Sequence, residues 1–160
     1  MEEQFTFKNK LMKQFIFFLT ISLFIVFGIQ GQEKKYNNYN SSKKEITNMM
    51  LQQAKDWSNG DIEGFMEGYI KSDDLKFVGS KGITYGWKQT LENYKKKYPS
   101  KEHMGILTFK LLEFDQLAKD VFLVIGEYHL KRTVGDANGM FSIILKNIDG
   151  KWEIIADHSS

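Results

Sequence analysis

The sequence predicts an α+β fold, in which helices come first and an antiparallel sheet follows. Two observations lead to this prediction. Apolar residues recur at helical spacing between Lys44 and Pro99, and long strand-like segments run from His103 to the end of the chain. One junction between these segments is Asp149-Gly150, a dipeptide that favours two-residue hairpins. We therefore expect helices that pack against a meander of strands.

Residues 1–31 are typical of a secretory signal peptide and are not expected to belong to the fold. Three lysines precede an apolar run from Phe15 to Gly28, which is short for a membrane span of about 20 residues. We expect cleavage after Gly31 and export to the periplasm or the medium. An uncleaved N-terminal membrane anchor is the alternative, and Met12 is a second candidate for the start. Residues 32–44 are polar and rich in Asn and Ser, which predicts a linker.

The composition narrows the classes of function. The chain has 42% hydrophobic and 26% charged residues, as ordinary globular proteins do. Its formal net charge of +2 does not indicate nucleic-acid binding, and we interpret the basic run from Tyr94 to Tyr98 as a solvated helix face. Cysteine is absent, which excludes disulfides, thiolate metal sites and cysteine nucleophiles. No metal or cofactor is predicted.

Three helices and one hairpin are expected in the first half. The first helix spans Lys44 to Ser58, with one apolar stripe formed by Ile46, Met49, Met50, Ala54 and Trp57. Asn59-Gly60 ends it, and Asp61 caps a second helix over residues 61–70. Two glycines in that helix, Gly64 and Gly68, predict the close approach of another element. Residues 73–86 suggest two short strands, and a third helix ends at Pro99.

Four strands are expected in the second half, over residues 103–114, 120–133, 139–148 and 151–159. Both faces of the second strand start apolar and become polar toward the same end. Such a strand runs from a core into the mouth of a pocket. Its last residues include Arg132, the one arginine of the sequence and a candidate contact for an anion, although a surface role is the alternative.

The ending Asp157-His158-Ser159 contains the residue types of a hydrolase triad. Neighbours on a strand point to opposite faces, so these side chains cannot form the required relay, and no G-x-S-x-G motif occurs. His129 and His158, with a carboxylate, would supply ligands for zinc or iron, but no metal-binding spacing is present. Trp152, Ile154 and Ala156 share the strand face of His158, so we expect His158 to face inward.

Three short motifs resemble the DUF4440 or SnoaL-like branch of the NTF2-like superfamily. They are the Trp57-x-x-Gly60-Asp61 junction, the Gly86-Trp87 helix entry, and the Gly-Lys-Trp to Asp-His-Ser-Ser ending at 150–160. The resemblance covers residues 45–160 and implies a cone-shaped barrel, in which a curved antiparallel sheet wraps around helices and often forms a dimer. It brings no single activity, because the superfamily includes isomerases, cyclases, dehydratases and binding proteins.

The first functional hypothesis is an exported protein that binds a small apolar or amphipathic molecule in the cone. The candidate ligand-binding residues are Tyr69, Trp87, Tyr128, His129, Arg132 and His158. An enzyme of the isomerase, cyclase or dehydratase kind is the alternative, with His158, Asp157 and Tyr69 as catalytic candidates. A homodimeric structural or interaction module, its cavity filled by side chains, is the third. The sequence leaves open whether any reaction is catalysed.

Overall fold

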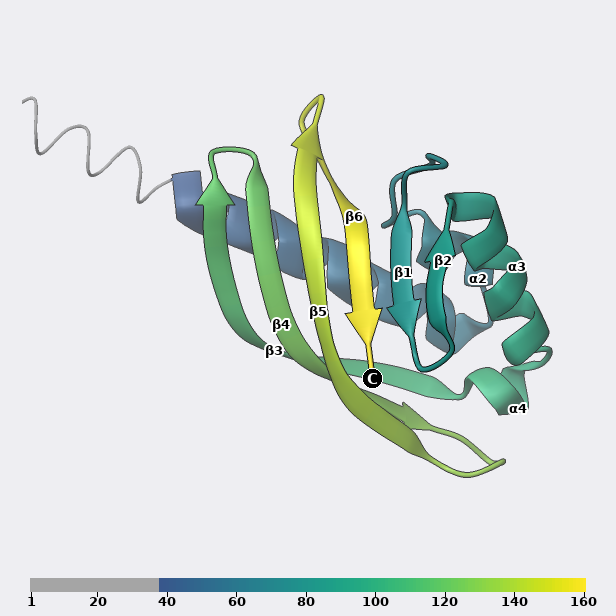
Figure 1. Cartoon of the computed structure of the whole chain (residues 1–160). Coiled ribbons are helices and arrows are strands. Elements are labelled where there is room, and N and C mark those ends of the chain that lie inside the picture. Colours follow the sequence, from purple (N-terminus) through teal and green to yellow (C-terminus); the bar gives the residue numbers. More distant parts are fainter. Residues whose placement is uncertain (1–37) are drawn as a thin grey trace, which may run out of the picture. The chain divides into compact units, whose positions relative to one another are not determined.

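Strand-forming residues from Ile106 to Ser159 build most of a curved, open sheet of six strands (Figure 1). The computed structural model describes residues 38–160. Four long antiparallel strands follow one another as the predicted meander: β3 (Ile106–Ala118), β4 (Val121–Lys131), β5 (Ala137–Ile148) and β6 (Lys151–Ser159). Asp149 and Gly150 both have positive φ, 52° and 87°, as the turn between β5 and β6 requires.

The other two strands form the predicted hairpin at the free edge of β6. They are β1 (Lys76–Gly79) and β2 (Gly82–Tyr85), which pair antiparallel with each other. The sheet order is β2-β1-β6-β5-β4-β3, and β1 runs parallel to β6. The expectation of a wholly antiparallel sheet is therefore wrong at this one pair. A parallel pair needs a long connection, which helices and four strands supply here.

The first described helix occupies residues 38–59, so it includes residues 38–44, which were predicted to be linker. Tertiary contacts outweigh the weak helix propensity of this polar segment. Ser42 is buried, and the ammonium of Lys43 lies 4.8 Å from the ring centroid of Phe114. The predicted signal peptide and the remainder of the predicted linker lie outside the described residues.

The second helix, α2 (Ile62–Met66), is shorter than predicted, and the side chain of Asp61 accepts a hydrogen bond from the Gly64 amide at its start. The chain then turns past Gly68. A Cβ on Gly68 would lie 2.5 Å from the side chain of Gln53, so the predicted close approach is confirmed there. Gln53 is buried and donates to the Phe65 carbonyl at 2.9 Å, which joins the first described helix to α2.

Two further helices precede the meander, α3 (Trp87–Lys97) and the short α4 (Lys101–Met104). The first strand was predicted to start at His103, and this is wrong because residues 101–104 are helical. The buried Met104 explains the turn. Its carbonyl accepts a hydrogen bond from the indole Nε1 of Trp57 at 2.9 Å, which draws this segment toward the helices.

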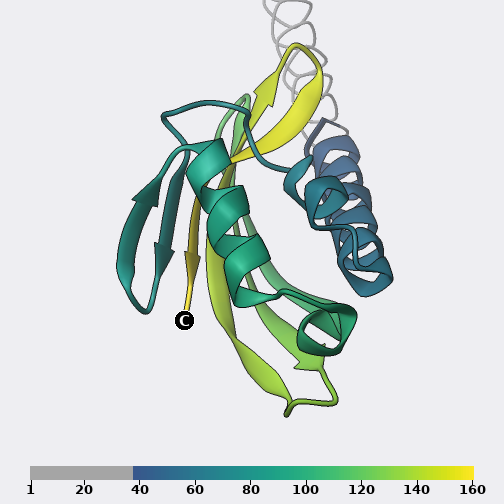
Figure 2. The ribbon, with the colours of Figure 1, turned by 90° about the vertical axis from the view of Figure 1, so that its right-hand side faces the viewer.

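The helices cover one side of the curved sheet (Figure 2). Trp57 packs against three aromatic rings, with its ring centroid 5.0 Å from that of Phe65, 5.7 Å from Tyr94 and 4.7 Å from Tyr98. All three contacts are edge-to-face, the arrangement that aromatic quadrupoles favour. The core lies between these rings and the inward side chains of β4, β5 and β6, such as Val124, Leu145 and Ile154.

The chain divides into two units, residues 1–41 and 42–160, and the second contains the whole sheet. Within residues 38–160, no helix has the length and apolar character that crossing a membrane demands.

Candidate functional site

A β-bulge in the last strand turns Asp157 into the interior. Ile144 pairs with Ala156 and Leu145 with Ile154, so Ile155 is an extra residue on β6. The bulge shifts the alternation by one position. Trp152 and Ile154 are buried before it, and Asp157, with 5% of its surface exposed, is buried after it. His158 is exposed, so the expectation that His158 faces inward is wrong.

Two hydroxyls hold the buried carboxylate of Asp157. Tyr69 donates to one carboxylate oxygen at 2.7 Å, and Ser159, two residues along the same strand, donates to the other at 2.7 Å. Both carboxylate oxygens of this buried group are therefore hydrogen-bonded, as a polar group away from water requires.

Backbone hydrogen bonds fix Tyr69 beside the last strand. The chain after α2 runs parallel to β6 at one bridge, between Tyr69 and Ile154. The Ile154 amide donates to the Gly68 carbonyl at 2.9 Å, and the Ile70 amide donates to the Ile154 carbonyl at 3.0 Å. Tyr69 is 3% exposed. The alignment of Tyr69 with Asp157 is thus set by backbone pairing.

Burial dominates the electrostatics of this cluster. It raises the pKa of Asp157 above its usual value, and the hydrogen bonds from Tyr69 and Ser159 offset part of the increase. Burial also raises the pKa of Tyr69 and of the neighbouring Tyr94 well above the usual value, and the nearby Asp157 charge adds to this. Both phenols therefore stay protonated, and the carboxyl takes up a proton more readily than an exposed one.

A cavity of about 160 Å³ lies beside the cluster, between the first described helix, α3 and the inner face of the sheet. Aromatic rings form much of its wall, including those of Trp57, Phe65, Phe77, Tyr94 and Phe141. Asp157, Ser159 and Gln53 supply polar groups. An engineered apolar cavity of about 150 Å³ binds benzene, whereas drug-sized ligands occupy about 300 Å³ or more. A cavity of this volume therefore suits a single ring.

Gly126 allows one of these rings to reach the cavity. A Cβ at Gly126 on β4 would lie 2.5 Å from the ring of Phe141, its cross-strand partner. Phe141 lies across this gap and contacts Phe109 edge-to-face at 5.4 Å. The residue without a side chain is thus what lets Phe141 form part of the wall.

Of the predicted ligand-binding residues, Tyr69 and Tyr128 line the cavity. Three others do not. His129 is exposed and lies 3.3 Å from a carboxylate oxygen of Glu127. Arg132 stabilises its own turn, since its Nε donates to the Gly135 carbonyl at 2.7 Å. With His158 also on the outside, no imidazole lines the cavity.

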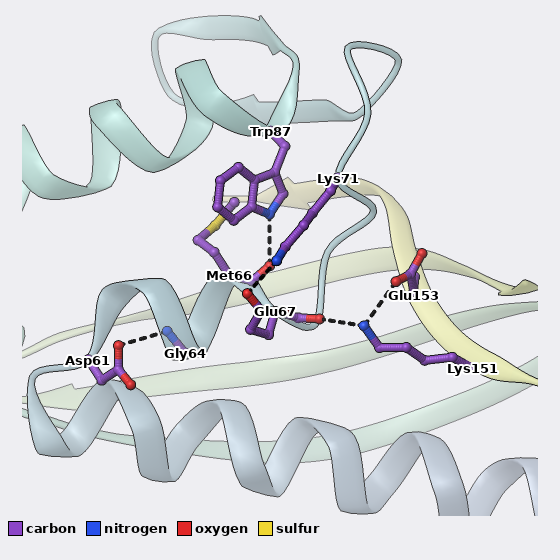
Figure 3. A network of polar contacts seen from close by, with 8 residues as sticks. All are labelled: Asp61, Gly64, Met66, Glu67, Lys71, Trp87, Lys151 and Glu153. Atoms are coloured by element: carbon purple, nitrogen blue, oxygen red, sulfur yellow. Dashed lines mark hydrogen bonds and ion pairs between the residues drawn. The ribbon is translucent and has the colours of Figure 1, made fainter.

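Trp87, the remaining candidate, joins two helices and does not line the cavity (Figure 3). Its indole Nε1 donates to the Met66 carbonyl at the end of α2, at a distance of 2.9 Å. The ammonium of Lys71 lies 5.4 Å from the centroid of its ring and forms an ion pair with Glu67 at 2.6 Å. Figure 3 also shows Lys151 of β6 reaching the Glu67 carbonyl, at 3.2 Å.

Sequence reasoning missed Tyr94 and Gln53 as residues of the cavity wall. Tyr94 follows Trp87 by two helical turns and precedes Tyr98 by one, so helical spacing places these rings on one face. This spacing was not used because the three lysines between Tyr94 and Tyr98 favoured the interpretation of the segment as a solvated helix face. Nothing in the sequence around Gln53 distinguishes it from an exposed glutamine.

Within residues 38–160, no cluster of three or more histidine or acidic side chains is placed to hold a metal ion. His129 and His158 are both exposed on the sheet. The chemistry available in the interior is therefore that of one carboxyl, tyrosine and serine hydroxyls, and an amide.

Solved structures with similar folds include NTF2-like proteins. An NTF2-like protein of unknown function from Shewanella oneidensis is 34% identical, with a TM-score of 0.72 over 74% of this chain and 98% of its own. An NTF2-like protein of unknown function from Pseudomonas putida is 16% identical, with a TM-score of 0.60 over 76% of this chain and 87% of its own.

A ketosteroid isomerase-like protein from Erwinia carotovora is also 16% identical, with a TM-score of 0.56 over 73% of this chain and 93% of its own. At this identity it shows the fold alone. No family model matches the sequence, and no curated protein matches it. The extensive match to the Shewanella protein at 34% identity is sufficient to decide membership. The chain belongs to the NTF2-like superfamily.

Proposed function

We propose that the chain is a small-molecule-binding protein, which holds an apolar or amphipathic molecule in the cavity beside Asp157. The observation that carries this proposal is the convergence of Asp157, Tyr69 and Ser159 at the wall of a cavity lined largely by aromatic and aliphatic side chains. Ligand pockets combine apolar walls with a few positioned polar groups in this way. The volume of about 160 Å³ suits one ring or a short alkyl group.

Native mass spectrometry of the full chain, purified from its source, tests this proposal. We expect a retained molecule of low mass in the wild-type protein and none in Ile143→Phe, whose larger side chain would fill the cavity. Ile144→Phe is the matched control, because Ile144 is the next residue of β5 and is absent from the cavity wall. Retention of the molecule by both variants contradicts binding in this cavity. Failure of the wild-type protein to retain any molecule contradicts it as well.

An enzyme is the second candidate, and the position of Asp157 favours it. The buried carboxyl lies 2.7 Å from a tyrosine hydroxyl, and burial raises its pKa toward the range of general bases. Asp157 in its carboxylate form would accept a proton from the carbon next to a carbonyl. The Asp157 carboxyl, once protonated, would donate to the Tyr69 oxygen, and the Tyr69 hydroxyl would then turn its own proton to the enolate oxygen.

This second candidate is tested by solvent exchange. 4-Phenyl-2-butanone in heavy water should exchange the protons next to its carbonyl in the presence of the protein, and proton NMR follows the loss of their signals. Asp157→Asn should abolish the acceleration and His158→Asn should leave it unchanged. Exchange at the uncatalysed rate with the wild-type protein removes this candidate.

We further propose a homodimer through the outer face of the sheet. Leu123, Ile125 and Ile144 are half-buried there, on the face opposite the buried Phe122 and Val124. Apolar side chains that cluster on a surface favour association. Light scattering after gel filtration should give twice the monomer mass for the wild type and the monomer mass for Ile125→Lys.

Two further proposals rest on the sequence. Export is supported by the basic and apolar character of residues 1–31, and N-terminal sequencing of the protein from its source tests cleavage after Gly31. Membership of the DUF4440 or SnoaL-like branch is supported by the Gly86-Trp87 entry and the Asp-His-Ser-Ser ending.

A further inference from the structure

A second hollow, of about 510 Å³, lies between the β1–β2 hairpin and α3. The two elements are adjacent in Figures 1 and 2, and the Asn93 amide of α3 donates to the Thr84 hydroxyl of β2 at 3.2 Å. We call this hollow the hairpin groove. Phe77, Tyr94 and Lys97 line both the hairpin groove and the inner cavity, so the two spaces adjoin.

The charge of the hairpin groove is of one sign. Lys81 of the β1–β2 turn and Lys96 and Lys97 of α3 line it, and no carboxylate does. None of these lysines forms an ion pair with a residue in the described range 38–160. The neighbouring Lys95 differs, because it forms an ion pair with Glu63 of α2. Three exposed ammonium groups thus surround one opening without a counter-charge.

The part of the inner cavity beside Asp157 disfavours an anion, whereas Lys97 lies where this cavity adjoins the hairpin groove. The one carboxyl of the inner cavity, Asp157, is buried and accepts hydrogen bonds from Tyr69 and Ser159 on both oxygens. A ligand carboxylate placed there would meet a second carboxyl away from water, which is costly. The rings of Phe77 and Tyr94 at the junction accept an apolar group more readily. An amphipathic anion would therefore be oriented with its apolar end inward.

We infer that the protein binds a monocarboxylate whose single ring or short alkyl end occupies the inner cavity and whose carboxylate lies in the hairpin groove among Lys81, Lys96 and Lys97. This inference rests on the proposed binding function and adds to it the class of ligand and its orientation. The separate volumes of about 160 Å³ and 510 Å³ fit a small apolar end and a longer, hydrated polar end. Serine and threonine hydroxyls of the groove, from Ser80 and Thr84, supply further donors.

The test compares carboxylates with their uncharged amides. The full chain is titrated calorimetrically at pH 7.5 and low salt with ω-phenylalkanoates of three to six carbons in the acid chain, and with the corresponding amides. We expect the best acid to bind about tenfold more tightly than its amide, as two or three exposed charge contacts would give. High salt should reduce this ratio, because it screens exposed charges.

Lysine variants locate the preference. The triple variant Lys81→Gln, Lys96→Gln and Lys97→Gln should bind the acid and the amide within about threefold of each other, mainly through a loss of affinity for the acid. Lys95→Gln is the matched control, since this lysine shares the exposed end of α3 but is paired with Glu63, and it should keep the wild-type ratio. Circular dichroism checks that each variant is folded. If the triple variant unfolds, each single variant should show a smaller decrease in the ratio of acid to amide affinity.

The outcomes separate the two proposals. Equal affinity of the wild-type protein for acid and amide, or an undiminished acid preference in the lysine variants, overturns the orientation while the binding function stands. If the variants lose only thermal stability, the lysines serve the end of α3 and the inference is wrong. Absence of binding for every acid and amide overturns this inference, and native mass spectrometry of the protein from its source decides the binding function separately.

Discussion

The hydroxyl of Tyr69 donates to Asp157 at 2.7 Å, and the two residues are 88 positions apart in the sequence. Both are buried. This hydrogen bond joins the segment after α2 to the last strand, and it satisfies a carboxyl that would otherwise be unpaired on one side.

Replacement of Asp157 by Asn should change how stability depends on pH. The pKa of Asp157 is raised in the folded state, so the folded protein binds more protons than the unfolded chain above the ordinary carboxyl pKa. The contribution of Asp157 to the free energy of unfolding is therefore greatest below about pH 4 and falls as the pH rises through the folded-state pKa. Urea unfolding from about pH 3 to pH 8 should show this decline in the wild type and lose it in Asp157→Asn. Parallel curves would show that the carboxyl titrates normally.

Removal of the Tyr69 hydroxyl should destabilise the fold. Tyr69→Phe leaves the buried carboxyl with Ser159 as its one remaining hydroxyl partner, and we expect a loss of about 1–3 kcal/mol in the free energy of unfolding. Tyr128→Phe is a suitable control, because its hydroxyl lies 3.5 Å from the Ser160 carbonyl and is exposed. Denaturant titration should give less than about 0.5 kcal/mol for that variant. Similar losses for both would show that the Asp157 contact contributes little.

His158→Ala should leave stability within about 0.5 kcal/mol of the wild type, as for other exposed positions. Ligand retention should also be unchanged, because the imidazole is not part of the cavity wall. Thermal unfolding and native mass spectrometry measure the two effects. A loss of ligand in this variant would mean that His158 acts on the cavity from outside.

Trp87→Phe separates packing from binding. The substitution removes the hydrogen bond from Nε1 to the Met66 carbonyl and should cost about 1 kcal/mol of stability. The affinity for phenylalkanoates should stay within about twofold, since Trp87 lies outside the cavity wall. Calorimetry on both proteins checks this, and a large loss of affinity at unchanged stability would restore Trp87 as a ligand contact.

The order of elements could be predicted from the sequence, because periodicity is strong where an element has one buried face. The stripe from Ile46 to Trp57 and the Asp149-Gly150 turn are examples. The face of the last strand could not be predicted in the same way. Strict alternation along the strand places Asp157 on the outer face. The extra residue Ile155 reverses this assignment, and no residue type near Ile155 predicts a bulge.

The site could be predicted only in part, for a related reason. Tyr69 was expected to contact a ligand, and it does lie at the cavity. Trp87 and His129 were also expected to do so and lie elsewhere. Membership of a cavity depends on contacts between distant segments, such as the bridge from Tyr69 to Ile154. A single sequence does not contain that information.

The position of β6 has a consequence for folding. This strand is the last in the chain, yet it lies between β5 and β1 and hydrogen-bonds to both. The pairing of β6 with β5 joins strands that are adjacent in the sequence. The pairing with β1 closes a loop of about 80 residues, and such long-range pairing forms slowly. We therefore expect the meander to assemble first and the β1–β2 hairpin to dock afterwards. The cavity and the hairpin groove would then arise together in that late step, so binding activity would report on completion of folding.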